Sequence, residues 1–179
     1  DPACGSGNFL IVAYKRLRSL EHRIIVRIAE LDSRKAALFA TSVISLDQFY
    51  GIELDDFAHD IATLSLWLAK HQMNVEFNDL FGIDIPLIPL TETGHIHNGN
   101  AALVDWQDVT PGGPDTYVCG NPPFVGSKKQ TASHKADFKA YFGGKYPAEL
   151  DYISLWFLKA ADYAVATGAE VGLVATNSI

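Results

Sequence analysis

Two short segments of the chain carry residue types that can perform chemistry. The first, Asp1-Pro2-Ala3-Cys4-Gly5-Ser6-Gly7, is followed by a long helical pattern. Glycines in a strand-to-helix turn let the backbone approach a ligand, and the next helix offers free N–H groups. Such turns serve NAD, FAD, nucleotides and S-adenosylmethionine. An acid at the end of the following apolar run, Glu53, is placed to accept hydrogen bonds from a ribose diol, so a nucleoside cofactor is favoured.

The second segment is Asn121-Pro122-Pro123-Phe124, which ends a short apolar run. Proline stiffens the loop and has no N–H, so the backbone carbonyls stay fixed as acceptors beside the amide oxygen of Asn121. Acceptors aimed at one point suit an amino group and favour the positive charge that develops when the amine attacks. Phe124 can stack on a base that has left the duplex. The alternative interpretation is a plain turn with a buried phenylalanine.

Positive charge is concentrated in two parts of the chain. Half of the 14 Lys and Arg residues precede residue 36, and Lys70 is the only one between there and Ser127. Five lysines then follow the second segment with only Asp137 opposing them, at positions 128, 129, 135, 139 and 145. This stretch is predicted to be a basic loop, either simply solvated or contacting phosphates beside a reaction site.

Alternating helical and strand patterns must position these segments. Apolar residues at steps of three and four predict a long helix after the glycine turn, with a buried face made of Phe9, Leu10, Ala13, Leu17, Leu20, Ile24, Ile28 and Leu31. A shorter helix is expected at 33–42 and a strand at 49–53. Asp55 and Asp56 are expected to cap a helix that buries Phe57, Ile61, Leu64 and Leu68.

The rest of the chain continues the alternation after an interruption. Prolines and glycines within 73–94 predict a long irregular connection. Further strands are expected at 95–103, 115–119 and 171–175, and a helix at 151–166 with Gly168 as its C-cap. Short apolar strands alternating with helices predict an α/β fold, with a mostly parallel sheet and helices on both faces.

Composition excludes several classes of protein. With 179 residues, of which 48% are hydrophobic, the chain can bury one sizeable core, and its net charge of −7 argues against a uniformly basic nucleic-acid coat. Cys4 and Cys119 cannot make a disulfide scaffold, and His95 and His97 have no third ligand in view, so no metal site is expected. No run is long enough for a membrane span and no signal segment is recognisable, so a soluble protein in a reducing cytoplasm is expected.

Taken together, the motifs resemble those of the N6-adenine DNA methyltransferases. The stretch from Asp1 to Leu10 matches their cofactor motif, and Asn121 to Phe124 matches their catalytic motif. The wider context resembles the large single-chain type IIG and type IIL restriction-modification enzymes, through Tyr50-Gly51-Ile52-Glu53-Leu54, Gly99-Asn100-Ala101, Gly120 to Lys128 and Val174 to Ile179. The resemblance implies a Rossmann-like class I methyltransferase core in a prokaryotic cytoplasm.

The resemblance also implies roles for individual residues. S-adenosylmethionine would be bound by Asp1, Ala3, Gly5, Gly7, Asn8, Phe9, Glu53, Asn100 and Ala101. Within this set, the glycine turn would line the methionine half, Glu53 would take the ribose hydroxyls, and Asn100 would stand where Asp usually reads the cofactor adenine. A flipped adenine of double-stranded DNA would be held by Asn121, Pro122, Pro123 and Phe124, and DNA would be contacted by Lys128, Lys129 and Lys135.

A longer enzyme is expected around this chain, whose only methionine is Met73. The chain would be a partial catalytic domain truncated at both ends, with a cofactor-binding half at 1–105 and a catalytic half at 106–179. An upstream region, a possible nuclease domain and a target-recognition domain would lie outside it, and the isolated piece would bind the cofactor weakly and lack activity. The alternatives are a methyltransferase acting on a protein glutamine or an RNA base amine, and a DNA-binding module that has lost catalysis.

Overall fold

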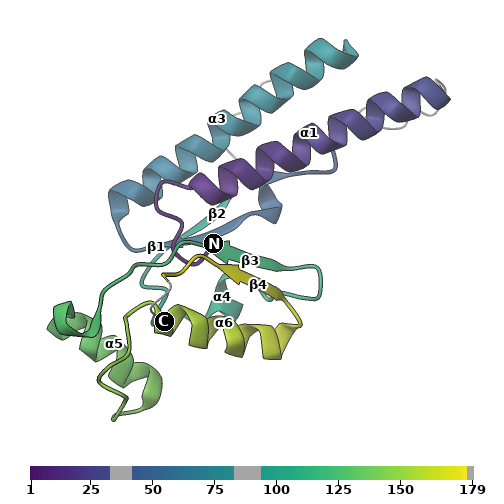
Figure 1. Cartoon of the computed structure of the whole chain (residues 1–179). Coiled ribbons are helices and arrows are strands. Elements are labelled where there is room, and N and C mark those ends of the chain that lie inside the picture. Colours follow the sequence, from purple (N-terminus) through teal and green to yellow (C-terminus); the bar gives the residue numbers. More distant parts are fainter. Residues whose placement is uncertain (33–41, 83–93, 177–179) are drawn as a thin grey trace.

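The protein has an α/β fold built from short parallel strands and helices. The computed structural model describes residues 1–32, 42–82 and 94–176. Strand β1 (Tyr50–Glu53) pairs in parallel with β2 (His95–Asn98), and β3 (Tyr117–Gly120) pairs in parallel with β4 (Glu170–Leu173). Helices cover both faces of these strands, as predicted (Figure 1): α1 (Asn8–Leu31) and α3 (Asp56–Phe81) on one side, α4 (Trp106–Val109) and α6 (Ser154–Thr167) on the other.

Residues 1–4 lie between the two strand pairs. The Asp1 nitrogen donates to the Tyr50 carbonyl at 2.9 Å, the Ile52 nitrogen to the Asp1 carbonyl at 2.9 Å, and the Cys4 nitrogen to the Ile52 carbonyl at 3.1 Å. The rest of the space between β1 and β3 is a cavity of about 400 Å³, lined by side chains from α1, α4 and α6 as well as both strands. Within the described ranges the pairs therefore do not merge into one continuous sheet.

The buried side chains form two clusters. One lies between the strands and α6 and includes Ile52, Trp106, Val118, Leu155 and Trp156. The other lies among α1, α3 and the segment before β1, and includes Leu10, Tyr14, Leu46, Ala62 and Leu66. The first cluster combines residues from both halves of the chain, so the two halves share a core.

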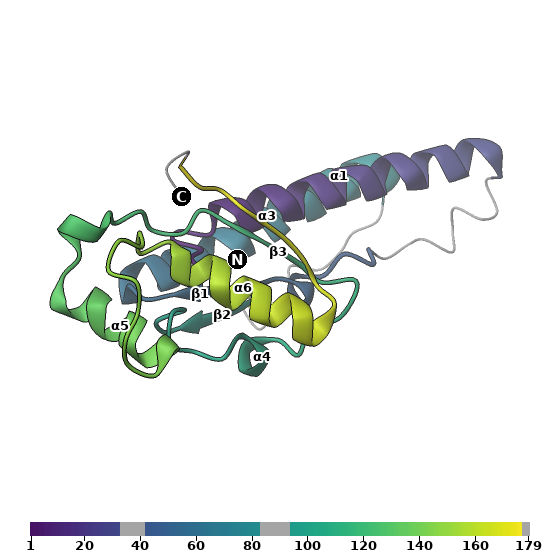
Figure 2. The same cartoon turned by 60° about the horizontal axis from the view of Figure 1, so that its bottom comes forward.

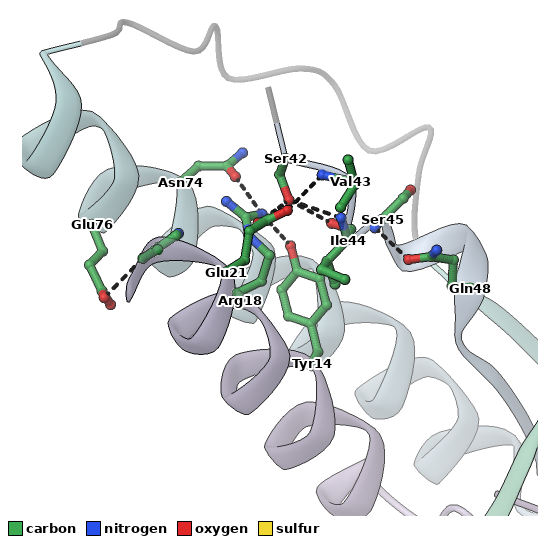
Figure 3. Close-up of polar contacts among 11 residues, drawn as sticks. Tyr14, Arg18, Glu21, Ser42, Val43, Ile44, Ser45, Gln48, Asn74 and Glu76 are labelled. Carbon is green, nitrogen blue, oxygen red and sulfur yellow. Dashed lines mark hydrogen bonds and ion pairs between the residues drawn. The ribbon is translucent and has the colours of Figure 1, made fainter. Parts of the chain in front are cut away.

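The face of α1 that is buried differs from the predicted one. Phe9, Leu17, Leu20, Ile24 and Leu31 are 39–71% exposed. Leu10 is buried as predicted, but the other buried residues are Tyr14, Arg18, His22 and Ile25. The physical reason is the parallel packing of α1 on α3, which Figure 3 shows from the side. The periodicity of apolar residues predicted that the apolar face of α1 is buried, but α3 packs on the face of α1 that carries Tyr14, Arg18 and His22.

Polar contacts make the burial of that face possible. The Arg18 Nη1 donates to the Tyr14 hydroxyl at 2.9 Å and to Asn74 Oδ1 at 3.1 Å, and its Nε lies 3.2 Å from Glu21 Oε2 (Figure 3). His22 Nδ1 lies 3.2 Å from Glu76 Oε1. A buried cation is tolerated when it is paired and hydrogen-bonded. The guanidinium of Arg18, which is 2% exposed, has the ion pair with Glu21 and the two bonds from Nη1, while its buried Nη2 has no hydrogen-bond partner among the described residues.

Helix α3 also corrects two predictions. Phe57, Leu64 and Leu68 are 75%, 48% and 44% exposed, and the buried stripe is instead Ala62, Leu66, Ala69, Met73 and Phe77. Small residues on this stripe allow close packing, since a Cβ on Gly7 would lie only 3.4 Å from Ala62. The irregular connection predicted from residue 73 is wrong for 73–81, because the helix continues to Phe81 and ends at Gly82 in the left-handed conformation. Residues 83–93 lie outside the described part.

Most other elements agree with the sequence patterns. The strands lie within or beside the predicted ranges, Asp55 caps α3 by accepting from the Ala58 nitrogen at 2.8 Å, and Gly168 ends α6 with a φ of 78°. The helix predicted at 33–42 falls on undescribed residues apart from Ser42. The predicted basic loop is partly wrong, because it contains the helix α5 (Ala132–Phe142), which Thr131 caps, at the edge of the molecule (Figure 2).

Candidate functional site

The glycine turn before α1 has the open geometry that a ligand-binding turn needs. Gly5 and Gly7 both have positive φ, 54° and 84°, a conformation that glycine adopts without strain. An added Cβ on Gly5 would meet nothing within 4 Å, so the space in front of the turn is free. Gly7 is the N-cap of α1, and no side chain caps the first-turn N–H groups, which include those of Asn8 and Phe9.

Glu53 closes this turn from the end of β1. Its Oε2 accepts from the Gly5 nitrogen at 2.8 Å, and its Oε1 accepts from the Leu54 and Asp55 nitrogens at 2.9 Å each. Hydrogen bonds to an ionised group are stronger than neutral ones. The structure thus brings together Gly5 and Glu53, which lie 48 positions apart in the sequence.

The Asn-Pro-Pro-Phe turn follows directly from β3 and lies beside the glycine turn. A Cβ at Gly120 would collide with the carboxylate of Asp1, so Gly120 lies directly against this side chain and a larger residue would force it to move. Pro122 is fully buried, whereas Asn121 and Pro123 are exposed and Phe124 is 42% exposed. Among the described residues, nothing forms a hydrogen bond with the Asn121 amide. The turn is therefore anchored from behind while its polar and aromatic groups remain available.

The loop after Phe124 is held by residues that sequence reasoning missed. The Val125 nitrogen donates to Asp151 Oδ1 at 3.1 Å, and the Tyr152 nitrogen donates to the Val125 carbonyl at 3.0 Å. Gln130 Nε2 also donates to the Val125 carbonyl, at 3.2 Å. No local pattern marks these side chains, because each acts on a backbone group brought close only by the fold.

Asn100, just after β2, is part of a buried polar group that also includes missed residues. Its Oδ1 accepts from the Ala102 nitrogen at 2.9 Å, and its Nδ2 donates to Asp137 Oδ2 at 3.1 Å. The Tyr152 hydroxyl donates to the same Asp137 oxygen at 2.5 Å. Burial, together with the hydrogen bond to Asp137 and its charge, raises the pKa of Tyr152 well above its usual value, which keeps the hydroxyl a donor.

The remaining candidate site residues fall into two groups, the alanines, which are buried or partly buried, and the lysines, which are exposed. Ala101 is 4% exposed and Ala3 is partly buried, whereas Lys128 and Lys129, on a short 3₁₀ turn at Ser127–Lys129, and Lys135, on α5, are exposed. Cys4 is buried, and Cys119 is partly buried. In the part of the chain that the structure describes, no three His, Cys, Asp or Glu side chains gather as a metal site would require. Nor does any described helix combine the length and apolar character needed to cross a membrane.

Comparison with known proteins places this chain in a family. The model of the MmeI DNA-methyltransferase domain matches residues 1–179. The chain belongs to this family. DNA methyltransferase A of Bacillus subtilis (strain 168) is 51% identical over 183 residues, and the putative type II restriction enzyme and methyltransferase RM.MjaORFECS2P of Methanocaldococcus jannaschii is 39% identical over 109 residues. The resemblance to methylase cores of large restriction-modification enzymes is confirmed.

A solved structure supports the same assignment for the fold. The type IIL restriction-modification enzyme MmeI in complex with DNA matches with a TM-score of 0.83 and 40% sequence identity over 100% of this chain. The chain spans 24% of that protein and 20% of the Bacillus subtilis relative, while the match to the archaeal relative covers 60% of this chain and 9% of that protein. The family relation therefore concerns the methyltransferase domain, and the individual site residues stay predictions.

Proposed function

We propose that this domain transfers a methyl group from S-adenosylmethionine to the N6 amino group of adenine in double-stranded DNA, within a restriction-modification or related DNA-modification enzyme. The observation that carries the proposal is the contact between Gly120 and Asp1, which places the exposed Asn121 turn against the glycine turn. A donor held at one turn and an amine held at the other would meet without further rearrangement.

The residues of the glycine turn fit an S-adenosylmethionine molecule. The free space in front of Gly5 and the uncapped N–H groups at the start of α1 suit the carboxylate of its methionine half. Glu53, at the end of β1, suits a ribose hydroxyl through Oε2, which accepts only from Gly5 and keeps a second lone pair, whereas Oε1 already accepts from Leu54 and Asp55. Asn8, Phe9, Asn100 and Ala101 complete the proposed cofactor set.

Catalysis at the other turn requires only acceptors and a stacking surface. When bound, the cofactor supplies an electrophilic methyl group on sulfur. The Asn121 side-chain oxygen and the carbonyls fixed by Pro122 and Pro123 accept hydrogen bonds from the adenine amine, whose developing positive charge they stabilise. Phe124 stacks on the flipped base from its half-exposed position.

The proposal extends to the complete enzyme. Lys128, Lys129 and Lys135 contact DNA phosphates next to the target base, since all three are exposed on the segment that follows Phe124. The chain comprises a cofactor-binding half at 1–105 and a catalytic half at 106–179 of a cytoplasmic protein. The two parallel strand pairs with helices on both sides (Figure 1) fit a Rossmann-like class I methyltransferase core.

Methyl transfer by the full-length protein tests the reaction. Purified parent enzyme is incubated with tritiated S-adenosylmethionine and unmodified DNA, and the product nucleosides are identified by mass spectrometry. We expect N6-methyladenine with the parent enzyme and none with Asn121→Ala. Label in RNA or protein instead of DNA would move the assignment to those substrates. Cofactor binding without any transfer would favour a DNA-binding module that has lost catalysis.

A further inference from the structure

The buried polar group around Asp137 joins the two halves of the site. Asn100 follows β2 in the cofactor-binding half, whereas Asp137 lies on α5 in the catalytic half. The orientation of the Asn100 amide is determined by its neighbours, because its oxygen faces the Ala102 N–H and its NH₂ faces a carboxylate. A flipped amide would place its NH₂ against the Ala102 N–H and its oxygen against the Asp137 carboxylate, so both hydrogen bonds would be lost.

Asp137 is an unusual residue to bury at this position. It is 5% exposed, and none of the ion pairs among the described residues includes it. Its partners are instead the two donors on Oδ2, the Asn100 amide and the Tyr152 hydroxyl. Burying a carboxylate costs free energy unless strong hydrogen bonds compensate for the lost water. A neutral side chain would pack here at lower cost, so the charge calls for a reason other than stability.

From Tyr152 the contacts continue to the catalytic turn. The Tyr152 nitrogen donates to the Val125 carbonyl at 3.0 Å, and the neighbouring Asp151 accepts from the Val125 nitrogen at 3.1 Å. Both backbone groups of Val125 are thereby held by residues 151 and 152, next to the aromatic ring proposed to stack on the target base. Two side-chain hydrogen bonds link Asn100 to Asp137 and Asp137 to the Tyr152 hydroxyl, and the backbone nitrogen of the same tyrosine bonds Val125.

We propose that Asp137 and Tyr152 are positioning residues that couple cofactor binding at Asn100 to the placement of the catalytic turn at Phe124. This inference rests on the proposed function, since it assigns Asn100 to the cofactor and Phe124 to the base. Cofactor contact adds to the bonds that already orient the Asn100 amide, which strengthens its hold on Asp137 and so on the Tyr152 hydroxyl, and Tyr152 in turn holds Val125. Filling one site therefore favours the binding-competent form of the other.

The same geometry explains why residue 100 is an asparagine. An aspartate there would oppose the Asp137 carboxylate across the 3.1 Å now spanned by a hydrogen bond, and two carboxylates this close repel unless one is protonated. Asn100 and Asp137 therefore form one functional pair, in which the amide donates and the acid accepts.

Binding measurements on the full-length enzyme test the coupling. The Kd for DNA is measured with and without saturating S-adenosylhomocysteine, and the ratio is compared between wild type and Tyr152→Phe, which lacks only the hydroxyl. We expect a ratio of about fivefold or more in the wild type and a value near one in the variant, with cofactor affinity in the absence of DNA little changed. Tyr141→Phe is the matched control, because its hydroxyl donates to Asp162 at 2.7 Å outside these contacts, and it should keep the wild-type ratio.

A double variant tests the pairing with donor and acceptor exchanged, in which the Tyr152 hydroxyl would accept from the amide introduced at position 137 instead of donating to Asp137 Oδ2. Asn100→Asp alone should lower kcat/KM for the cofactor by about tenfold or more, since the repulsion acts on the site directly. Adding Asp137→Asn exchanges donor and acceptor and should restore most of that loss. A double variant no better than the single one would overturn the pairing, and a wild-type ratio near one, or an unchanged ratio in Tyr152→Phe, would overturn the coupling. Loss of N6-methyladenine from the wild type would instead refute the proposed function.

Discussion

The two turns of the site are stabilised in opposite ways. The glycine turn is held by its own hydrogen bonds, from the Ala3 nitrogen to Asp1 Oδ1 at 3.0 Å and from the Gly7 nitrogen to the Cys4 carbonyl at 2.8 Å, and by the bond from the Gly5 nitrogen to Glu53 at 2.8 Å. The Asn-Pro-Pro-Phe turn is held only from behind, through buried Pro122 and the bonds to Val125, and no hydrogen bond to the Asn121 amide is found in the described residues. One turn thus has its shape before any ligand binds, while the other keeps its polar group free for the substrate.

The largest effect is expected at the Asn-Pro-Pro-Phe turn. Asn121→Ala should lower methyl transfer by about 10²–10³-fold, because it removes one preorganised acceptor at the reacting amine. The melting temperature should remain unchanged, since the side chain is exposed and forms no hydrogen bond in the described structure. Initial rates and thermal unfolding of the full-length variant measure the two quantities. A marked loss of stability would show that this turn is internally held after all.

A change at the glycine turn should lower both cofactor affinity and the melting temperature. Glu53→Gln replaces a carboxylate that accepts from Gly5, Leu54 and Asp55 with a neutral amide that has a single acceptor oxygen. Each weakened bond to a charged group is worth about 1.5–3 kcal/mol, so cofactor affinity should fall by about tenfold or more and the protein should also melt earlier. Calorimetry with S-adenosylhomocysteine and a melting curve test this. A variant that loses affinity alone would remove the contrast between the turns.

The contact between the turns can be changed separately. Gly120→Ala adds a methyl group that must displace the Asp1 carboxylate, whereas Gly172→Ala, on the neighbouring strand β4, meets nothing within 4 Å. Overpacking of this kind costs about 1–3 kcal/mol, and here it also moves the turns apart, so kcat/KM should fall in the first variant only. Equal behaviour of the two variants in steady-state assays would mean that the close approach is not required.

A smaller effect is expected from the basic segment that follows the Asn-Pro-Pro-Phe turn. Replacing Lys128 and Lys129 together with Ala should weaken DNA binding and reduce the slope of log K against log salt by about two, because each phosphate contact contributes roughly 0.9. Cofactor affinity should be unaffected. Arg23→Ala, an exposed cation on α1, serves as the control in the same titration. An unchanged slope in the lysine variant would remove this segment from the DNA interface.

The smallest effect concerns the buried thiol of Cys4 in the glycine turn. Burial raises the pKa of Cys4 from 9.0 to about 11, so the folded state keeps the thiol protonated at pH values where the unfolded state has begun to lose its proton. The contribution of Cys4 to stability is therefore complete below pH 9 and is lost as the pH rises towards 11. Alkylation followed by mass spectrometry should leave Cys4 unmodified at pH 8 in the native enzyme. Rapid native modification would mean that the turn opens.

Local chemistry made much of this arrangement predictable from the sequence. The strands, the cap at Asp55 and the glycine stop at Gly168 follow from neighbouring residues, and Glu53 could be paired with the glycine turn because parallel strands end at one edge. The buried faces of α1 and α3 were not predictable, because the bond between Arg18 and Asn74 forms only when the two helices pack together. Helix α5 was not predicted because its lysines made the segment resemble a solvated basic loop. The contacts of Asp137 and Tyr152 were not predictable either, because the spacing of these residues in the sequence follows no recognisable pattern.

The contacts between the halves also bear on how such genes could recombine. Trp156 Nε1 donates to the Pro2 carbonyl at 2.9 Å, and a backbone acceptor is present whatever residue occupies position 2. The bond between Asn100 and Asp137 joins two side chains, so it survives only if both are inherited together. A chimaera of two relatives joined near residue 105 would keep the tryptophan contact from either parent but would separate the Asn100 and Asp137 pair. A chimaera whose parents differ at position 100 or 137 would therefore lose this side-chain pair, whereas the bond from Trp156 needs only a backbone carbonyl.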